Sequence, residues 1–150
     1  MSAPDPERLA VWRSLFTTHA RLTQALTIAL ENERDLPLTW FESLNALQLA
    51  GGRVRVMDLA EHLVVNASSL SRQLVRMEAG GLIRRERGYR GDQRAVVVVL
   101  TRQGRDIWRR ANRTYLRVAK SMFLSRLSET DVGAMQRVFN KVIDAQAPNG

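Results

Sequence analysis

The side chains with the clearest chemical potential in this sequence are arginines and serines. Three serines and two arginines lie within "NASSLSRQLVR" at residues 66–76, and five arginines surround two glycines within "RRERGYRGDQR" at residues 84–94. Guanidinium groups donate paired hydrogen bonds to anionic oxygens, and serine hydroxyls can donate to the same acceptors. Both stretches therefore predict contact with an anionic partner.

Catalytic chemistry is poorly represented. His19 and His62 lie in different expected helices without acids at metal-ligand spacing. The serine-rich stretch lacks the flanking glycines that expose a nucleophilic serine. The chain has no cysteine, which excludes disulfides, thiolate metal sites and thiol redox switches. We therefore expect no enzymatic activity, no metal and no cofactor.

The formal net charge of +8 is unevenly distributed along the 150 residues. Residues 1–52 carry −2 and residues 127–150 carry −1. Residues 53–101 carry +4 from nine basic and five acidic side chains, and residues 102–126 carry +7 from eight basic and one acidic side chain. A positive field of this kind favours an anionic macromolecule as partner.

The length fits one folded unit over residues 1–150. The first residues, "MSAPDPERLAVW", lack a basic run followed by an apolar core, and no apolar run approaches the length of a membrane span. We therefore expect a cytoplasmic protein without a membrane segment.

Apolar residues recur every three or four positions from Pro6 to about residue 36 and predict a long amphipathic helix. Thr39 and Glu42 have the spacing of a capping box, which predicts the start of a second helix. A very short strand is expected at residues 53–56. Two short helices follow it, joined by a turn at residues 64–65, and Asn66 is the expected N-cap of the second.

A hairpin is expected next, with strands at residues 82–86 and 95–101 and a tip at residues 87–93. Thr101 then caps a long helix, and Ser128 with Asp131 predicts the start of a last one. Two short helices followed by a hairpin form a winged helix-turn-helix. The predicted fold is therefore mainly α with a small β-hairpin wing, an α+β arrangement.

The second short helix has an apolar face and a polar face. Leu70, Leu74 and Met77 point inward when residues are placed at helical intervals. The opposite arc carries hydroxyls and guanidinium groups without an acid, which suits a helix in the major groove of DNA. Its members are Ser68, Ser69, Arg72 and Arg76, with Gln73 at the border, where it could reach an adenine. An ordinary solvated face would also be polar, so this alternative stays open.

The hairpin tip indicates the same partner. Arg87, Arg90 and Arg94 lie beside two glycines, and the narrow minor groove of DNA attracts arginine. The four valines at residues 96–99 have high strand propensity and would hold the tip rigid. Asp92 could pair with the guanidinium of Arg94 and fix its direction. A merely solvated hairpin stays the alternative.

At these residues the chain resembles the MarR-type winged-helix transcriptional regulators. The resemblance is carried by "LAEHLVVNASSLSRQLVRMEAGGLIRR" at residues 59–85 and by "DQRAVVVVLTRQG" at residues 92–104. The second stretch is similar to the family's wing signature, Asp-x-Arg, then an apolar strand, Leu-Thr and a glycine three residues on. It implies a sequence-specific regulator of double-stranded DNA, a bacterial repressor that a small effector releases from a pseudo-palindromic operator.

The resemblance also implies roles for individual residues. Arg94 matches the wing arginine that enters the minor groove, and Asp92 matches the acid that braces it. Ser71 joins the side chains of the helix that such proteins lay in the major groove. Gln93 stands where many members have arginine, which removes one phosphate contact from each subunit, and the lack of cysteine excludes the family's thiol-based peroxide sensing.

The family implies a homodimer. Its N- and C-terminal helices, here residues 6–36 and 102–146, would interlock and carry a DNA-binding lobe at residues 38–101. The implied interface residues are Leu9, Trp12, Leu15, Phe16, Val138 and Val142. Members often bind anionic aromatic molecules between the lobe and the dimerisation helices, which would place Trp12, His19 and Trp40 at an effector pocket. Aromatic residues at helical spacing also occur in a plain core or interface.

Six arginines make the helix after the wing basic, namely Arg102, Arg105, Arg109, Arg110, Arg113 and Arg117. They could touch DNA phosphates, stay in water or pair with acids of the partner chain. The sequence also permits a rival function, a winged-helix protein-interaction module whose basic surface meets an acidic partner. Such a module has no need to keep Asp92, Arg94 and the acid-free arc together, so their presence favours the regulator.

Overall fold

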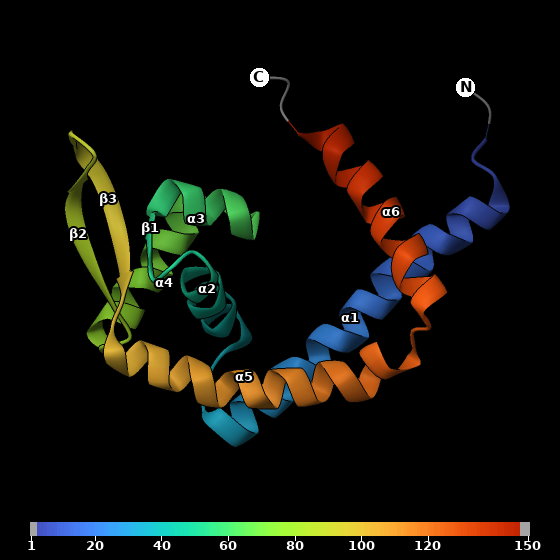
Figure 1. Ribbon diagram of the computed structural model, residues 1–150, viewed down its shortest axis with the longest axis horizontal. Coiled ribbons are helices and arrows are strands. Elements are labelled where there is room, and N and C mark those ends of the chain that lie inside the picture. The colour runs from blue at the N-terminus through green and yellow to red at the C-terminus, as the bar shows by residue number, and fades with distance from the viewer. Residues whose placement is uncertain (1–2, 148–150) are drawn as a thin grey trace.

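The computed structural model describes residues 3–147, in which long helices flank a winged helix-turn-helix lobe (Figure 1). The first half contains α1 (Pro6–Arg34), α2 (Leu38–Leu49), β1 (Arg53–Arg55), α3 (Val56–Leu63) and α4 (Ala67–Ala79). The second half contains β2 (Ile83–Tyr89), β3 (Asp92–Leu100), α5 (Arg102–Met122), the 3-10 turn η1 (Leu124–Arg126) and α6 (Glu129–Gln146). The prediction of a mainly α protein with a small hairpin wing is confirmed.

The helix starts agree with the sequence predictions except at α2 and at α3, which begins at Val56 inside the strand predicted at residues 53–56. Side-chain caps form where they were predicted, at Asn66 for α4, Thr101 for α5 and Ser128 with Asp131 for α6. The predicted cap at Thr39 is wrong, because α2 begins at Leu38 with Pro37 as its N-cap and without a side-chain cap bond. Proline fixes its own φ near the helical value and so leads the chain into the helix two residues earlier.

The wing belongs to a three-stranded antiparallel sheet in the order β1-β3-β2. Since β3 is the central strand, it pairs on both edges, and Val97 and Val98 are fully buried. The hairpin strands extend further toward the tip than predicted, with one shift in register between Arg87 and Tyr89. Arg90 and Gly91 alone form the turn, with φ of 47° and 85°. Two positive φ angles are typical of the two-residue type I′ turn that matches the twist of the strands.

The hydrophobic core lies where α2, α3 and α4 pack against the sheet and the first half of α5. Phe41 of α2 stacks on Tyr115 of α5 with ring centroids 4.7 Å apart. The indole nitrogen of Trp108 donates to Asn45 Oδ1 at 3.0 Å. These contacts fix α5 to the lobe, so the wing that precedes α5 has a rigid base.

A polar network joins the end of α1 to α5. Thr114, which is buried, donates to a carboxylate oxygen of Glu33 at 3.0 Å and accepts from Arg34 Nε at 2.9 Å. Arg117 donates to the other oxygen of Glu33. The hydrogen bond from Arg117 is the largest of the effects that hold the pKa of Glu33 below its ordinary value of 4.5, and the bond from Thr114 comes next.

Acid should weaken this junction. A lowered folded-state pKa means that Glu33 stabilises the fold at pH values above 4.5, and that this stabilisation is lost as the pH falls through the folded-state pKa. We expect Glu33→Gln to lower the urea midpoint at pH 7 and to flatten its fall below pH 4.5. Arg117→Gln should act similarly, with little added loss in the double variant because the two side chains share one bond. Additive losses would contradict the pairing.

Candidate nucleic-acid interface

The outward arc of α4 is arranged as the sequence indicates. Leu70, Leu74 and Met77 are buried. The exposed side chains opposite them are Ser68, Ser69, Arg72 and Arg76, and Ser71 is half-buried beside the arc. Arg72 Nη2 donates to Ser69 Oγ at 3.2 Å, and neither Arg72 nor Arg76 forms an ion pair within residues 3–147. The two guanidinium groups therefore keep donors for another molecule.

Gln73 is placed differently from its predicted role. Its side-chain nitrogen donates to Ser43 Oγ at 2.8 Å and lies 3.3 Å from the backbone oxygen of Thr39. Both partners belong to α2, and Ser43 is fully buried. The amide of Gln73 therefore ties α4 to α2, and this geometry does not support contact with an adenine. The helical periodicity put Gln73 at the border of the arc but could not reveal its partner.

Val75 is an outward residue that the sequence reasoning missed. Its side chain is 50% exposed, on the same side of α4 as Ser68 and Ser71. Its helical position was readable, but an isolated valine on a surface helix is common and gave no functional signal. An aliphatic side chain there can contact the methyl group of a thymine in the major groove.

Two of the five wing arginines, Arg84 and Arg85, are paired with acidic side chains of the protein itself. Arg85 donates from its backbone nitrogen to Glu78 at 2.7 Å and from its guanidinium at 2.9 Å. Glu86 accepts from Arg53 at 2.6 Å and from Arg84 at 3.0 Å. These hydrogen bonds lower the pKa of both carboxyl groups, so both stay ionised at neutral pH.

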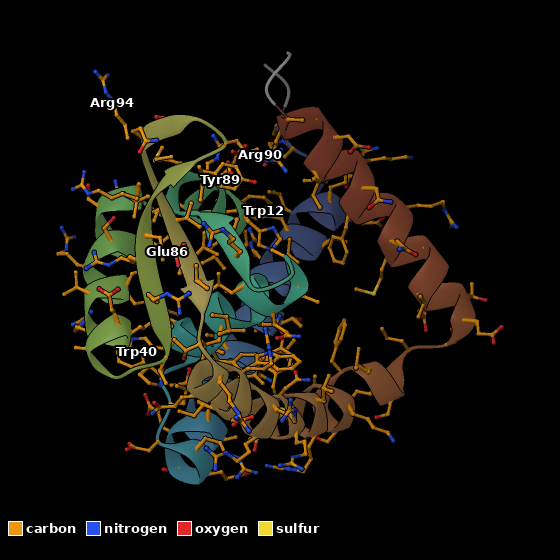
Figure 2. All side chains as sticks on the ribbon, turned by 60° about the vertical axis from the view of Figure 1, so that its left-hand side comes forward. Trp12, Trp40, Glu86, Tyr89, Arg90 and Arg94 are labelled. Atoms are coloured by element: carbon orange, nitrogen blue, oxygen red, sulfur yellow. The ribbon has the colours of Figure 1, made fainter. Side chains whose placement is uncertain are left out.

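The other three wing arginines, Arg87, Arg90 and Arg94, form no ion pair within the described residues. Arg94 extends from β3 away from the body of the molecule, whereas Arg90 lies beside Tyr89 at the hairpin turn (Figure 2). Asp92 braces this region by another route than predicted. Its Oδ1 accepts a hydrogen bond from the backbone nitrogen of Arg94 at 2.9 Å. Within residues 3–147, the side chains of Asp92 and Arg94 form no ion pair with each other. Asp92 therefore fixes the main chain of Arg94 and leaves its guanidinium unpaired.

The outward part of α4 and the wing line one surface hollow of about 700 Å³. Ser68 and Ser71 lie on its helix side, and Asp92 and Arg94 lie on its wing side. The structure thus brings two of the predicted α4 residues together with two of the predicted wing residues, which lie more than twenty positions further along the chain. The hollow is not lined by Ser69, Arg72, Arg76, Arg87 or Arg90.

The apolar residues expected at a dimer interface are largely uncovered in the protomer. On α1, Trp12 is 59% exposed and Phe16 is 56% exposed, and their rings lie 4.7 Å apart. On α6, Val138 and Val142 are about half exposed, and no side chain of this helix is buried within residues 3–147. Leu15 is also exposed, whereas Leu9 is half-buried. The two helices form an open V on the side away from the wing (Figure 1).

The three aromatic residues predicted at an effector pocket are not brought together in one protomer. Trp40 lines a cavity of about 570 Å³ with the end of α1 and with Ile107 and Arg110 of α5. Trp12 and His19 do not line this cavity, and Trp12 lies far from Trp40 (Figure 2). The reason is the length of α1, a continuous helix of 29 residues. Arg110 also lines this cavity, although the sequence predicted it only as one of the six arginines of the basic helix after the wing.

The arginines of α5 are partly paired within the protomer. Arg117 pairs with Glu33, Arg109 pairs with Asp106 at 3.1 Å, and Arg105 Nε donates to Gln48 at 3.3 Å. Part of the basic face therefore stabilises the junction of α5 with α1 and α2. Within residues 3–147, no helix combines the length and hydropathy of a membrane span, and no cluster of three or more potential metal-ligating side chains occurs.

Comparisons with known proteins agree with this geometry. The sequence model of the MarR family matches residues 34–95, from the end of α1 through the start of β3. The crystal structure of AbsC, a MarR family transcriptional regulator from Streptomyces coelicolor, is similar over 99% of this chain and 100% of its own, with a TM-score of 0.89 and 25% sequence identity. The chain is a MarR-type winged-helix protein. This finding confirms the resemblance in the sequence, and because MarR family regulators are DNA-binding proteins it also confirms the prediction that the protein is not an enzyme.

Two further solved structures share the MarR-family fold. One is Sco3205, a MarR family regulator from Streptomyces coelicolor in complex with DNA, with 24% identity, a TM-score of 0.88 and coverage of 99% of this chain and 93% of that one. The other is the organohalide-sensing regulator RdhR bound to 2,4-dichlorophenol, with 21% identity, a TM-score of 0.78 and coverage of 99% and 89%. None of the curated proteins matches the sequence significantly.

Proposed function

We propose that this MarR-type protein binds an operator sequence in double-stranded DNA, with α4 in the major groove and the wing in the minor groove. The observation that carries the proposal is the hollow that Ser68 and Ser71 of α4 share with Arg94 of the wing. Next to these two serines, the exposed face of α4 carries hydroxyl and guanidinium groups and no acidic side chain. Arg72 and Arg76 meet base edges or phosphates, and Val75 meets a thymine methyl. The structure of the Streptomyces coelicolor relative in complex with DNA supports DNA as the partner.

The binding unit is a homodimer formed by α1 and α6. Their exposed aromatic and aliphatic side chains are the support for this arrangement, since such a surface is stable when a partner covers it. A two-fold dimer reads a pseudo-palindrome, with half-sites about one helical turn, or roughly 34 Å, apart.

The regulator acts as a cytoplasmic repressor that a small molecule releases from the operator. The cavity at Trp40 is the candidate effector site, because it lies between the lobe and the long helices and combines an indole with the guanidinium of Arg110. The dichlorophenol bound to RdhR supports an aromatic ligand class. The cavity also borders Glu33 and Arg34, so an occupant would touch the junction of α1 with α5.

Selection of bound duplexes from a random DNA pool tests the proposal. We expect an enriched palindrome that the dimer binds about a thousandfold more tightly than random duplex, with affinity that falls steeply with salt. That operator then serves to screen effectors. Uniform weak binding that disappears with salt would contradict the proposal and favour the protein-interaction module, for which an acidic protein partner should be sought.

A further inference from the structure

Tyr89, the last residue of β2, has two guanidinium groups close to its ring at the end of the wing. The guanidinium carbon of Arg90 is 5.1 Å from the ring centroid, and that of Arg55 is 5.7 Å away. Both distances are within the range of about 6 Å at which a cation is attracted to an aromatic face. Arg90 is the neighbouring turn residue, whereas Arg55 comes from β1.

Arg55 is itself held in place by α3. Its Nε donates to Asp58 Oδ2 at 2.7 Å, and its Nη2 donates to Asp58 Oδ1 at 3.0 Å. A two-bond pair of this kind fixes the plane of the guanidinium as well as its position. The pair lowers the pKa of Asp58 and raises the pKa of Arg55, so both groups are charged at neutral pH.

The outer part of the hairpin needs such a contact. Pairing between β1 and β3 ends at Arg55 and Val97, so residues 87–96 extend beyond the third strand. A small change in the angle of this extension would displace Arg94, which lies within it, relative to Arg72 on α4. The Arg55–Tyr89 contact connects the end of the extension to the helix-turn-helix.

We propose that Asp58, Arg55 and Tyr89 form a clamp that holds the wing at the angle at which Arg94 and α4 reach DNA together. These are positioning residues, and the inference rests on the proposed function. The clamp runs from the first turn of α3 through the end of β1 to the end of β2. With this clamp, the affinity for the operator depends on the acidic side chain of Asp58, whereas the nonspecific attraction to any DNA does not.

The clamp and simple electrostatics predict opposite effects of Asp58→Asn. Removing a negative charge from a DNA-binding surface should tighten binding to any duplex if only the field matters. The clamp predicts looser binding to the operator, because Arg55 loses its charged partner and Tyr89 loses its fixed neighbour.

The experiment compares the full-length wild-type protein with Asp58→Asn by fluorescence anisotropy, using the selected operator and a scrambled duplex of equal length. We expect Asp58→Asn to bind the operator about threefold to fivefold more weakly and to bind the scrambled duplex no more weakly than wild type. The matched control is Glu61→Gln, which removes the same charge from an exposed position of α3 that forms no ion pair within residues 3–147. It should weaken neither complex. Operator binding by Asp58→Asn that equals or exceeds the wild type would overturn the clamp.

Variants of Tyr89 separate the clamp from a cap effect of Asp58 on α3. Tyr89→Phe keeps the ring and should retain operator affinity, whereas Tyr89→Ala should lose about threefold to fivefold and lose less when Asp58→Asn is already present. Additive losses would contradict the clamp. If the wild type prefers no operator, the proposed function has failed, and the clamp is judged by NMR of the DNA-free protein. Asp58→Asn should then shift the Tyr89 ring signals, and unchanged signals would overturn it.

Discussion

Arg94→Ala is expected to weaken binding to the selected operator by about tenfold to one hundredfold, the range for loss of one arginine that reaches into a groove. The guanidinium extends from the wing without an ion-pair partner within residues 3–147, so its removal breaks no ion pair in that part of the protein. The dimer should therefore stay folded, with an unchanged urea midpoint. Anisotropy titrations at several salt concentrations measure both the affinity and its salt dependence.

The matched control for this variant is Arg84→Ala. It removes the same charge from the same hairpin, but the guanidinium of Arg84 is held by Glu86. Because the carboxylate of Glu86 already offsets part of the positive charge of Arg84, we expect Arg84→Ala to change operator affinity by about twofold or less. If Arg94→Ala leaves both the affinity and the salt slope unchanged, the proposed role of the wing is wrong. If the two variants weaken binding equally, Arg94 acts only through its charge.

The parts of this fold that the sequence predicted are those encoded over a few residues. Side-chain caps at Asn66, Thr101 and Ser128 act on backbone groups two or three positions away, so their spacing was sufficient. The two-residue turn at Arg90 and Gly91 was not predicted, since the glycine-rich stretch also fits an open tip. Strand pairing across β1, β3 and β2 decides where the tip begins.

The candidate site was less predictable because its side-chain partners come from distant segments. Arg53 and Glu86 are 33 positions apart, and Gln73 and Ser43 are 30 positions apart. Sequence periodicity gives the direction of a side chain from its own helix but not the element that it meets. It therefore identified the exposed arc of α4 and the arginine-rich wing, but not which side chains are already used inside the protein.

Gly104→Ala is expected to lower the free energy of unfolding by at least about 3 kcal/mol, in the upper range for overpacking a tight site. A Cβ atom at Gly104 would lie 2.0 Å from the backbone oxygen of Leu82 and 2.9 Å from Leu100 Cδ1. The same oxygen of Leu82 accepts from the backbone nitrogen and from the hydroxyl of Thr101, at 3.2 Å and 2.9 Å. Since Thr101 also caps α5, neither backbone can move away without losing these bonds.

The matched control is Gly133→Ala in α6, where the nearest atom to an added Cβ is Arg137 Nη1 at 3.6 Å. This substitution should stabilise the protein by about 0.5 to 1 kcal/mol, as alanine usually does in an open helix. Urea denaturation at one fixed protomer concentration measures both variants, since dimer stability depends on concentration. Opposite signs would show that the glycine after Leu-Thr is required by the close approach of α5 to the backbone before β2. A loss below about 1 kcal/mol in Gly104→Ala would contradict that reading.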